Sequence, residues 1–253
     1  MACCGFVFAG IAAAAHAQNA PLPGGGWLPL TQSSAVIDDP FDGNPPYASY
    51  LDILGDKATA PVFVSSDVDY LYFRMRVAGS PFHTGGVNRL YAGLWACLLD
   101  IDQQPQTFEL LAGLDGTQVP NTVVLYENTS TAQPDDITDP AEVPVALSGA
   151  TTNWSYSLAG STLGGSGDYF LDWQVNWTDL ATAGFTNTMP FRLVCGTGTS
   201  ATSATSASLS GGDMLDGGSG SKSFSTDASD AVLCDDNGCR YYDALFKDGF
   251  EGP

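Results

Sequence analysis

Basic side chains are scarce in this sequence. Of its 253 residues, 8 are lysine or arginine and 28 are aspartate or glutamate, so the formal net charge is −20. A chain of this charge repels phosphate backbones and anionic lipids, and we expect no nucleic acid and no anionic membrane among its partners. The acidic excess either serves solubility alone or supplies oxygen ligands for divalent cations.

Histidine is almost absent as well. Only His16 and His83 occur, and His83 lies in a loop-like Pro-Phe-His-Thr-Gly-Gly stretch. A serine or cysteine nucleophile needs a base beside it, and the chain also lacks a Gly-x-Ser-x-Gly elbow, a P-loop and a dinucleotide fingerprint. With no Cys-x-x-Cys and so few histidines, zinc has little support. We therefore expect a protein that is not an enzyme.

Long apolar runs are missing too. The stretch from Phe6 to Ala15 is too short to span a bilayer, and Ala15-His-Ala17 fits a signal-peptidase site. We expect a signal peptide over 1–17, no transmembrane segment, and a secreted, periplasmic or cell-surface location. The composition then suggests an extended lead-in (18–30), one domain (31–215), a Gly/Ser-rich linker (216–230) and a tail (231–253).

Four cysteines remain after the predicted cleavage. An even number in an exported chain suggests two disulfides, which can pair in three ways. Cys234 and Cys239 flank a turn-forming Asn-Gly, which favours a local bond between them. Cys97 and Cys195 would then join two core strands.

Alternation of apolar and polar residues is the dominant pattern. Leu71, Phe73, Met75 and Val77 would share one face of a strand, and five alternate residues from Tyr169 to Trp177 another. The same theme recurs from Phe108 to Leu114, from Trp154 to Leu158 and from Phe191 to Cys195, while Leu90–Ile101 is apolar on both faces and reads as a central strand. Helical pattern is confined to 178–184. The sequence predicts an all-β, two-sheet antiparallel sandwich with few or no helices.

Three stretches resemble a group of exported bacterial proteins. Tyr70–Val77 (YLYFRMRV), Trp95–Asp102 with Thr107-Phe-Glu109, and Phe170–Val175 with Phe191–Thr197 are similar to strands of sandwich domains related to carbohydrate-binding-module-9 and DOMON-like folds. The resemblance implies a jelly-roll-like or CBM9-like sandwich that binds carbohydrate or another extracellular ligand without catalysis. Its matches concern strand and turn residues, so they bear on fold more than on activity.

The stretch Ala244-Leu-Phe-Lys-Asp-Gly-Phe-Glu251 near the C-terminus is similar to an "IF-x-DGFE" motif of exported bacterial proteins. This resemblance implies a role in export or surface sorting, and a surface-retained structural or adhesive protein is the alternative function. Alternatively, Phe246 and Phe250 dock onto the domain.

A metal site is predicted where a strand ends. Asp100 and Asp102 lie on one side of an extended chain, and Glu109 can join them across a hairpin. Carboxylates so placed suit Ca²⁺, although acids are also ordinary turn residues. A pair of such acids could alternatively serve a glycan hydrolase. Asp38, Asp39 and Asp42 form a second acidic cluster, and Asp67 is a third candidate.

A ligand face is predicted opposite the core. Tyr70, Tyr72, Arg74 and Arg76 alternate with the apolar residues of their strand. Aromatic rings beside forked donors suit sugar rings, whose C–H faces stack and whose hydroxyls accept hydrogen bonds. The same side chains could instead pack within the fold or pair with its acids. Trp95 and Trp154 are expected in the core.

Overall fold

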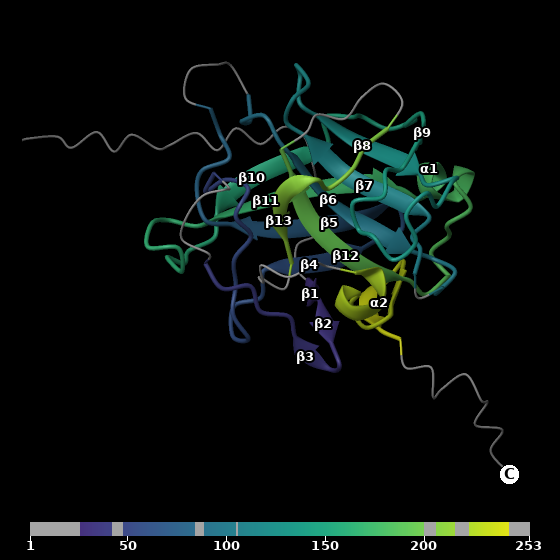
Figure 1. Ribbon diagram of the computed structural model, residues 1–253, viewed down its shortest axis with the longest axis horizontal. Coiled ribbons are helices and arrows are strands. Elements are labelled where there is room, and N and C mark those ends of the chain that lie inside the picture. Colours follow the sequence, from purple (N-terminus) through teal and green to yellow (C-terminus); the bar gives the residue numbers. More distant parts are fainter. Residues whose placement is uncertain are drawn as a thin grey trace, which may run out of the picture.

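The protein folds as two antiparallel sheets packed face to face. The computed structural model describes residues 26–41, 48–83, 89–104, 106–199, 206–215 and 223–242. The predicted signal peptide, most of the lead-in, Asp42 and the C-terminal motif lie outside these ranges. The described strands build the predicted all-β sandwich, whose sheets overlap in the view of Figure 1.

One sheet has five strands in the order β1-β4-β5-β11-β10, and the other has six in the order β13-β12-β6-β7-β8-β9. Two small hairpins, β2–β3 and β14–β15, lie beside them. The strands are β1 (Leu28–Pro29), β2 (Thr31–Gln32), β3 (Ala35–Val36), β4 (Val62–Ser66), β5 (Tyr70–Val77), β6 (Leu94–Asp100), β7 (Leu110–Asp115), β8 (Thr122–Glu127), β9 (Val143–Pro144), β10 (Trp154–Leu158), β11 (Tyr169–Asn176), β12 (Arg192–Gly198), β13 (Gly211–Met214), β14 (Val232–Asp235) and β15 (Gly238–Tyr241).

The core between the sheets follows the predicted alternation. The inward residues of β5 and β11 are buried together with those of β6 and β7. Phe73 and Trp173 are opposite each other in the β5–β11 register and stack at 5.4 Å between ring centroids. Trp95 and Trp154 are both in this core, as expected. Aromatic cross-strand pairs of this kind fix the register that places the outer residues.

The six-stranded sheet is covered on its outer face too. All seven residues of β6 are buried, with Trp95, Cys97 and Leu99 in the main core and the residues between them in a second cluster. This confirms the prediction of a doubly covered central strand. Two details of the predicted alternation are wrong. Phe108 precedes β7 and stacks on Phe224 in the second cluster, and Leu158, at the end of an edge strand, is 68% exposed.

Both predicted disulfides are confirmed. Cys97 and Cys195 are directly opposite each other on β6 and β12 and are bonded. Cys234 and Cys239 close the β14–β15 hairpin, in which Gly238 adopts a positive φ of 113°. Two disulfides are compatible with an extracellular protein.

Two short helices complete the described fold. Helix α1 (Trp177–Thr182) begins at Asn176, whose side chain caps it, and the chain leaves it at Gly184 with a φ of 82°. Helix α2 (Phe224–Asp227) falls within the expected linker, and burial of Phe224 packs the described part of that segment onto the sheet. No described helix has the length and apolar character needed to cross a membrane.

The expected tail also contributes to the core. Val232 is fully buried and bridges to Phe191, and Cys234 is buried beside it. The β14–β15 hairpin is therefore an integral part of the sandwich and not an appended loop.

Candidate functional site

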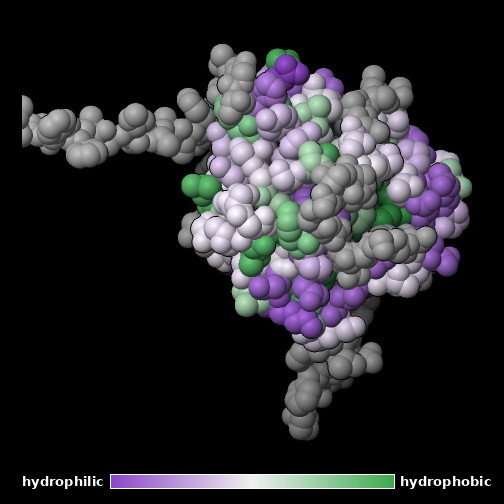
Figure 2. Space-filling model, turned by 60° about the vertical axis from the view of Figure 1, so that its left-hand side comes forward, coloured by the Kyte–Doolittle hydropathy of each residue, from purple (hydrophilic) through white to green (hydrophobic). Residues whose placement is uncertain are grey.

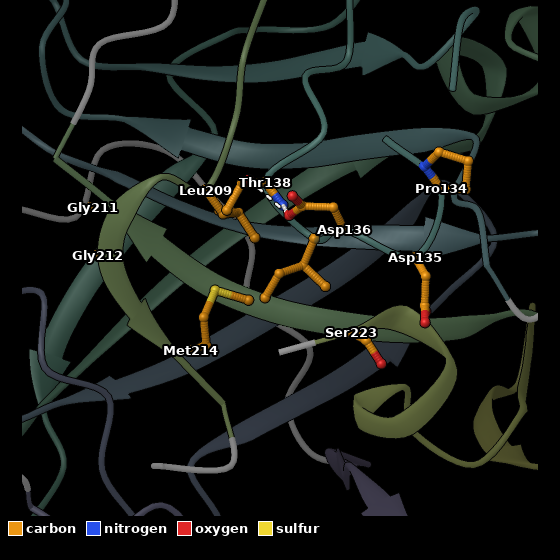
Figure 3. A pocket seen from close by; sticks show the side chains of 10 residues that line it. Pro134, Asp135, Asp136, Thr138, Leu209, Gly211, Gly212, Met214 and Ser223 are labelled. Carbon is orange, nitrogen blue, oxygen red and sulfur yellow. Dashed lines mark hydrogen bonds between the residues drawn. The ribbon is translucent and has the colours of Figure 1, made fainter. Parts of the chain in front are cut away.

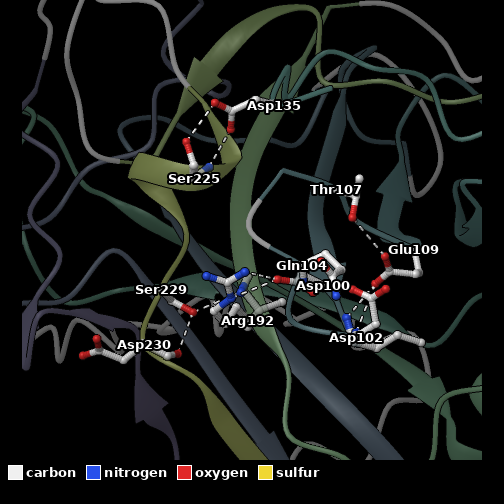
Figure 4. Close-up of polar contacts among 12 residues, drawn as sticks. Asp100, Asp102, Gln104, Thr107, Glu109, Asp135, Arg192, Ser225, Ser229 and Asp230 are labelled. Atoms are coloured by element: carbon white, nitrogen blue, oxygen red, sulfur yellow. Dashed lines mark hydrogen bonds and ion pairs between the residues drawn. The ribbon is translucent and has the colours of Figure 1, made fainter. Parts of the chain in front are cut away.

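Three carboxylates converge in the turn between β6 and β7. One oxygen each from Asp100, Asp102 and Glu109 lies within 4.8 Å of the others, the one such group of three or more possible metal ligands within the described residues. Asp100 is the last residue of strand β6, and Glu109 is the residue immediately before β7. Figure 4 shows Asp100 between Arg192 on one side and the other two acids on the other.

Asp100 is buried and only half engaged. The Nε and Nη2 atoms of Arg192, opposite it in the β6–β12 register, donate to its Oδ2. Its Oδ1 is buried and has no hydrogen-bond partner. Burial raises the pKa of the Asp100 carboxyl, and both Arg192 and the backbone N–H of Gln103 act against that rise without cancelling it. The site thus contains a buried oxygen that is suited to a cation.

Glu109 is held by the backbone of the turn. Its Oε2 accepts a hydrogen bond from the Ile101 N–H at 2.7 Å, and its Oε1 lies 3.5 Å from the Thr107 hydroxyl. Burial raises the pKa of Glu109, and the nearby negative charges of Asp102 and Asp100 add to the rise. Asp102 itself is exposed and accepts from the Gln104 N–H at 2.9 Å.

The donor set fits a hard divalent cation. Ca²⁺ is bound by six to eight oxygens, among them carboxylates. The three acids bring three negative charges, and Arg192 leaves a net charge of about −2 on the group. Both Asp100 and Glu109 have raised pKa values, because each is buried near other negative charges, and a bound cation would relieve that repulsion.

The predicted ligand residues lie on the outer face of the five-stranded sheet. Arg74 sits at its centre and binds both oxygens of Asp172 on β11, at 2.7 Å and 3.0 Å. Its guanidinium lies between two rings, 4.2 Å from the Trp27 centroid and 4.6 Å from that of Phe170. We call this surface the Arg74 face and define it by these four residues with Phe63, Tyr70, Tyr72, Arg76 and Gln174.

Two of the predicted ligand residues are engaged within the fold. Tyr72 is buried and donates to Asp67 at 2.6 Å, and its pKa is raised first by burial and then by that carboxylate. Arg76 is buried, donates to Ser161 and the Ala60 carbonyl, and has a pKa lowered by burial. Tyr70 stays half exposed.

Sequence reasoning did not single out several members of these sites. Trp27, Phe63 and Phe170 are half-buried aromatics around Arg74, and Asp172 and Arg192 neutralise charges from other strands. Alternation put Phe170 and Asp172 on one face of their strand. It could not show that this face adjoins Arg74, because that depends on strand pairing.

The other acidic candidates lie outside the β6–β7 turn, and Asp67 borders the Arg74 face through Tyr72. Asp38 and Asp39 line a pocket of about 220 Å³ with Phe41 and Leu163, and Asp42 lies outside the described residues. Asp67 caps the turn before β5, accepting from two backbone N–H groups as well as from Tyr72.

A larger pocket of about 540 Å³ lies between residues 134–138, Leu209 with strand β13, and Ser223 at the start of α2 (Figure 3). Its acids are engaged locally. Asp135 accepts from the backbone N–H and the hydroxyl of Ser225, and the first of these bonds is the main cause of its lowered pKa. Asp136 accepts from both donors of Thr138. The bonds between Asp135 and Ser225 anchor α2 to this loop.

Hydrophobic side chains on the visible face in Figure 2 form small separate groups among hydrophilic ones. Singly exposed apolar residues of this kind, such as Val119 and Leu158, are normal for a folded protein.

Three comparisons with known proteins give no relative to reason from. No family model matches the chain, no curated protein matches it, and no solved structure matches it. The likeness to CBM9-related and DOMON-like domains therefore stays an expectation, and the function has to be argued from the two sites themselves.

Proposed function

We propose that the protein is an extracellular, non-catalytic binding module that binds carbohydrate on the Arg74 face and holds Ca²⁺ in the turn after β6. The observation that carries the proposal is the group of half-buried rings around one fixed guanidinium. Trp27 and Phe170 flank Arg74, and Phe63 packs edge-on against Phe170 at 6.1 Å.

Such a group supports sugar binding for a physical reason. The rings are held by packing on a rigid sheet, so they lose little conformational freedom when a sugar stacks on them. Asp172 neutralises Arg74, and the acidic residues Asp67 and Asp69 adjoin Tyr72. The face therefore favours neutral sugars over anionic ones.

Support for the calcium part comes from Asp100. A buried carboxylate oxygen without a hydrogen bond is costly, and a cation bound by Asp100, Asp102 and Glu109 would compensate it. Ca²⁺ would also screen the repulsion among the three carboxylates and tie the β6–β7 turn together. Its role here is structural.

The carbohydrate part is tested by glycan-array binding of the exported chain, in parallel with Ca²⁺ and with EDTA. We expect saturable binding to neutral glycans, and Trp27→Ala or Phe170→Ala should weaken it at least tenfold. Removing a stacking ring costs about 1.5 kcal/mol of binding free energy, which corresponds to about a tenfold loss of affinity. Phe41→Ala, which truncates a 42% exposed ring outside this face, is the control. Equal binding by all variants would place the ligand elsewhere.

The calcium part is tested by calorimetric titration and thermal unfolding in Ca²⁺, Mg²⁺ or EDTA. We expect Ca²⁺ to bind and to raise the midpoint of thermal unfolding. In Asp102→Asn, both effects should require at least a tenfold higher Ca²⁺ concentration. Asp69→Asn removes an exposed acid outside the turn and should change neither. A wild-type protein that ignores millimolar Ca²⁺ would rule the ion out.

The same protein preparations distinguish two alternative functions from the proposed one. The raised pKa values of Glu109 and Asp100 favour a glycan hydrolase as second candidate, and it requires a glycan-cleaving activity that Glu109→Gln abolishes. A surface-retained adhesive protein would instead give no glycan binding and would be released from cells when residues 244–253 are removed.

A further inference from the structure

Gln174 is a buried amide to which the fold gives no partner. Its neighbours Trp173 and Val175 point into the core, so its own side chain points to the Arg74 face. It is 3% exposed, and neither its Oε1 nor its Nε2 has a hydrogen-bond partner.

Three polar neighbours of Gln174 on the same face are engaged. Asp172, two residues before it, is bound by Arg74, and Asn176, two residues after it, caps α1 through the Thr178 N–H. Tyr72, opposite Gln174 in the β5–β11 register, donates to Asp67. Ser155, opposite Asp172 on β10, also has a buried hydroxyl without a hydrogen-bond partner, whereas Gln174 lacks partners at both of its polar atoms.

A buried amide without hydrogen bonds destabilises a protein, and an apolar side chain of similar shape would avoid that cost. The position therefore points to a requirement other than stability. We propose that Gln174 is the polar contact of the carbohydrate site, hydrogen-bonding adjacent hydroxyls of a neutral sugar unit. The inference rests on the carbohydrate binding proposed above and names the residue that gives it specificity.

The chemistry of the amide matches this ligand. A glutamine offers two N–H donors and one carbonyl acceptor. Of two neighbouring ring hydroxyls, one can accept from the amide N–H while the other donates to the amide carbonyl. A site that hydrogen-bonds a hydroxyl in this way rejects the analogue that lacks it, because the buried group is then left unpaired. Gln174 would read hydroxyl positions, while the rings around Arg74 bind the apolar face of the sugar.

Trp27 packs on Tyr72, the residue opposite Gln174 in the β5–β11 register. The Trp27 ring is half buried, comes from the residues before β1 at the edge of the sheet, and packs edge-on against Tyr72 at 6.5 Å between centroids. Because Gln174 is 3% exposed, the proposal requires a side chain of this face to move when a sugar binds, and Trp27 at the sheet edge is the one that we assign to this movement.

The test is Gln174→Met, which keeps the length of the side chain and removes its hydrogen bonds. The probes are soluble dextran, laminarin, mannan and arabinoxylan, with polygalacturonate as the anionic comparison, titrated into the full exported chain. We expect the midpoint of thermal unfolding to stay equal or rise, and binding of the neutral polysaccharide to weaken about 10- to 100-fold. Gln118→Met, at an exposed glutamine in the turn before β8, should leave both unchanged.

A second measurement uses the wild-type protein alone. Monosaccharides of the bound polymer compete against it, each beside its single-deoxy analogues, and one or two adjacent positions should account for the loss of competition. Binding unchanged in Gln174→Met, or a variant whose unfolding midpoint falls by several degrees, would overturn this inference and leave the binding module in place. Silence of the wild type toward every glycan would overturn the proposed function, and this inference with it.

Discussion

Two ion pairs of the same composition sit in the two sheets, and they differ in how completely they are closed. Arg74 and Asp172 are opposite each other on β5 and β11, and Arg192 and Asp100 on β12 and β6. Both aspartates are fully buried, and the side chains of the arginines are 18% and 21% exposed. Burial raises the pKa of both carboxyls, against the effect of their arginines.

The difference lies in the second carboxylate oxygen. Arg74 bonds both oxygens of Asp172, whereas Arg192 bonds only Oδ2 of Asp100 and leaves Oδ1 without a hydrogen bond. Two more acids then approach Asp100, and none of the described acids does so at Asp172. A closed pair serves the fold, while a half-open pair with excess negative charge can also bind a cation.

Breaking the closed pair should have the largest effect. Arg74→Met leaves Asp172 buried without its partner, and we expect a loss of about 3 kcal/mol in the free energy of unfolding, because an unpaired buried charge is strongly destabilising. Urea unfolding in Ca²⁺ and in EDTA measures it, and the loss should be the same in both. The double variant Arg74→Met/Asp172→Leu should recover most of it.

The control for this loss is an exposed pair. Arg240 and Asp235 lie 2.6 Å apart with side chains 56% and 27% exposed, and Arg240→Met should cost no more than about 1 kcal/mol. If Arg74→Met cost as little as that, the pair on the Arg74 face would not be a stabilising element.

Breaking the half-open pair should have a smaller effect that depends on the ion. Arg192→Met removes the positive charge next to the three acids, so we expect about 1–2 kcal/mol of destabilisation in EDTA and roughly tenfold tighter binding of Ca²⁺. Saturating Ca²⁺ should restore the free energy of unfolding of Arg192→Met to the wild-type value. In Arg74→Met, Ca²⁺ should raise the free energy of unfolding only by as much as it does in the wild type. Equal behaviour of the two variants in Ca²⁺ would mean that the pairs do not differ as the geometry indicates.

The contrast between the pairs also marks how far the sequence could lead. Alternation predicted the inward face of β5, the doubly covered β6 and the opposite faces that carry Arg74 and Asp172. The turn acids were predicted as a group because they are close in sequence. These predictions depend on local periodicity, which a single chain displays directly.

Features set by strand pairing could not be predicted in this way. Arg74 and Asp172 are 98 residues apart, and Arg192 and Asp100 are 92 apart. Nothing local states that these strands are neighbours or in which register, and a shift of one residue would separate both pairs. The burial of Phe224 could not be predicted for the same reason. Phe224 lies in the expected linker and packs on the outer face of the six-stranded sheet, whose strands are distant from it in sequence.

The smallest expected effect is the pH dependence of Glu109. Its pKa is raised in the folded protein, above the value near 4.3 of an unfolded chain. Between these two values the folded state holds a proton that the unfolded state has lost, so this group lowers the free energy of unfolding as the pH rises. Glu109→Gln removes the charge and keeps an oxygen for the Ile101 N–H. In EDTA it should therefore be more stable than the wild type by about 0.5–1 kcal/mol at pH 7 and equal to it near pH 4.

An acid with the opposite shift provides the control. Arg240 lowers the pKa of Asp235, so Asp235→Asn should be less stable than the wild type at pH 7, and that deficit should disappear as the pH falls. Adding Ca²⁺ should reverse the order of the wild type and Glu109→Gln at pH 7, because only the wild type keeps all three carboxylates. If Glu109→Gln lost stability in EDTA, the negative charge of Glu109 would be stabilising the turn without an ion. The three acids would then serve the fold, and the contrast between the two ion pairs would not hold.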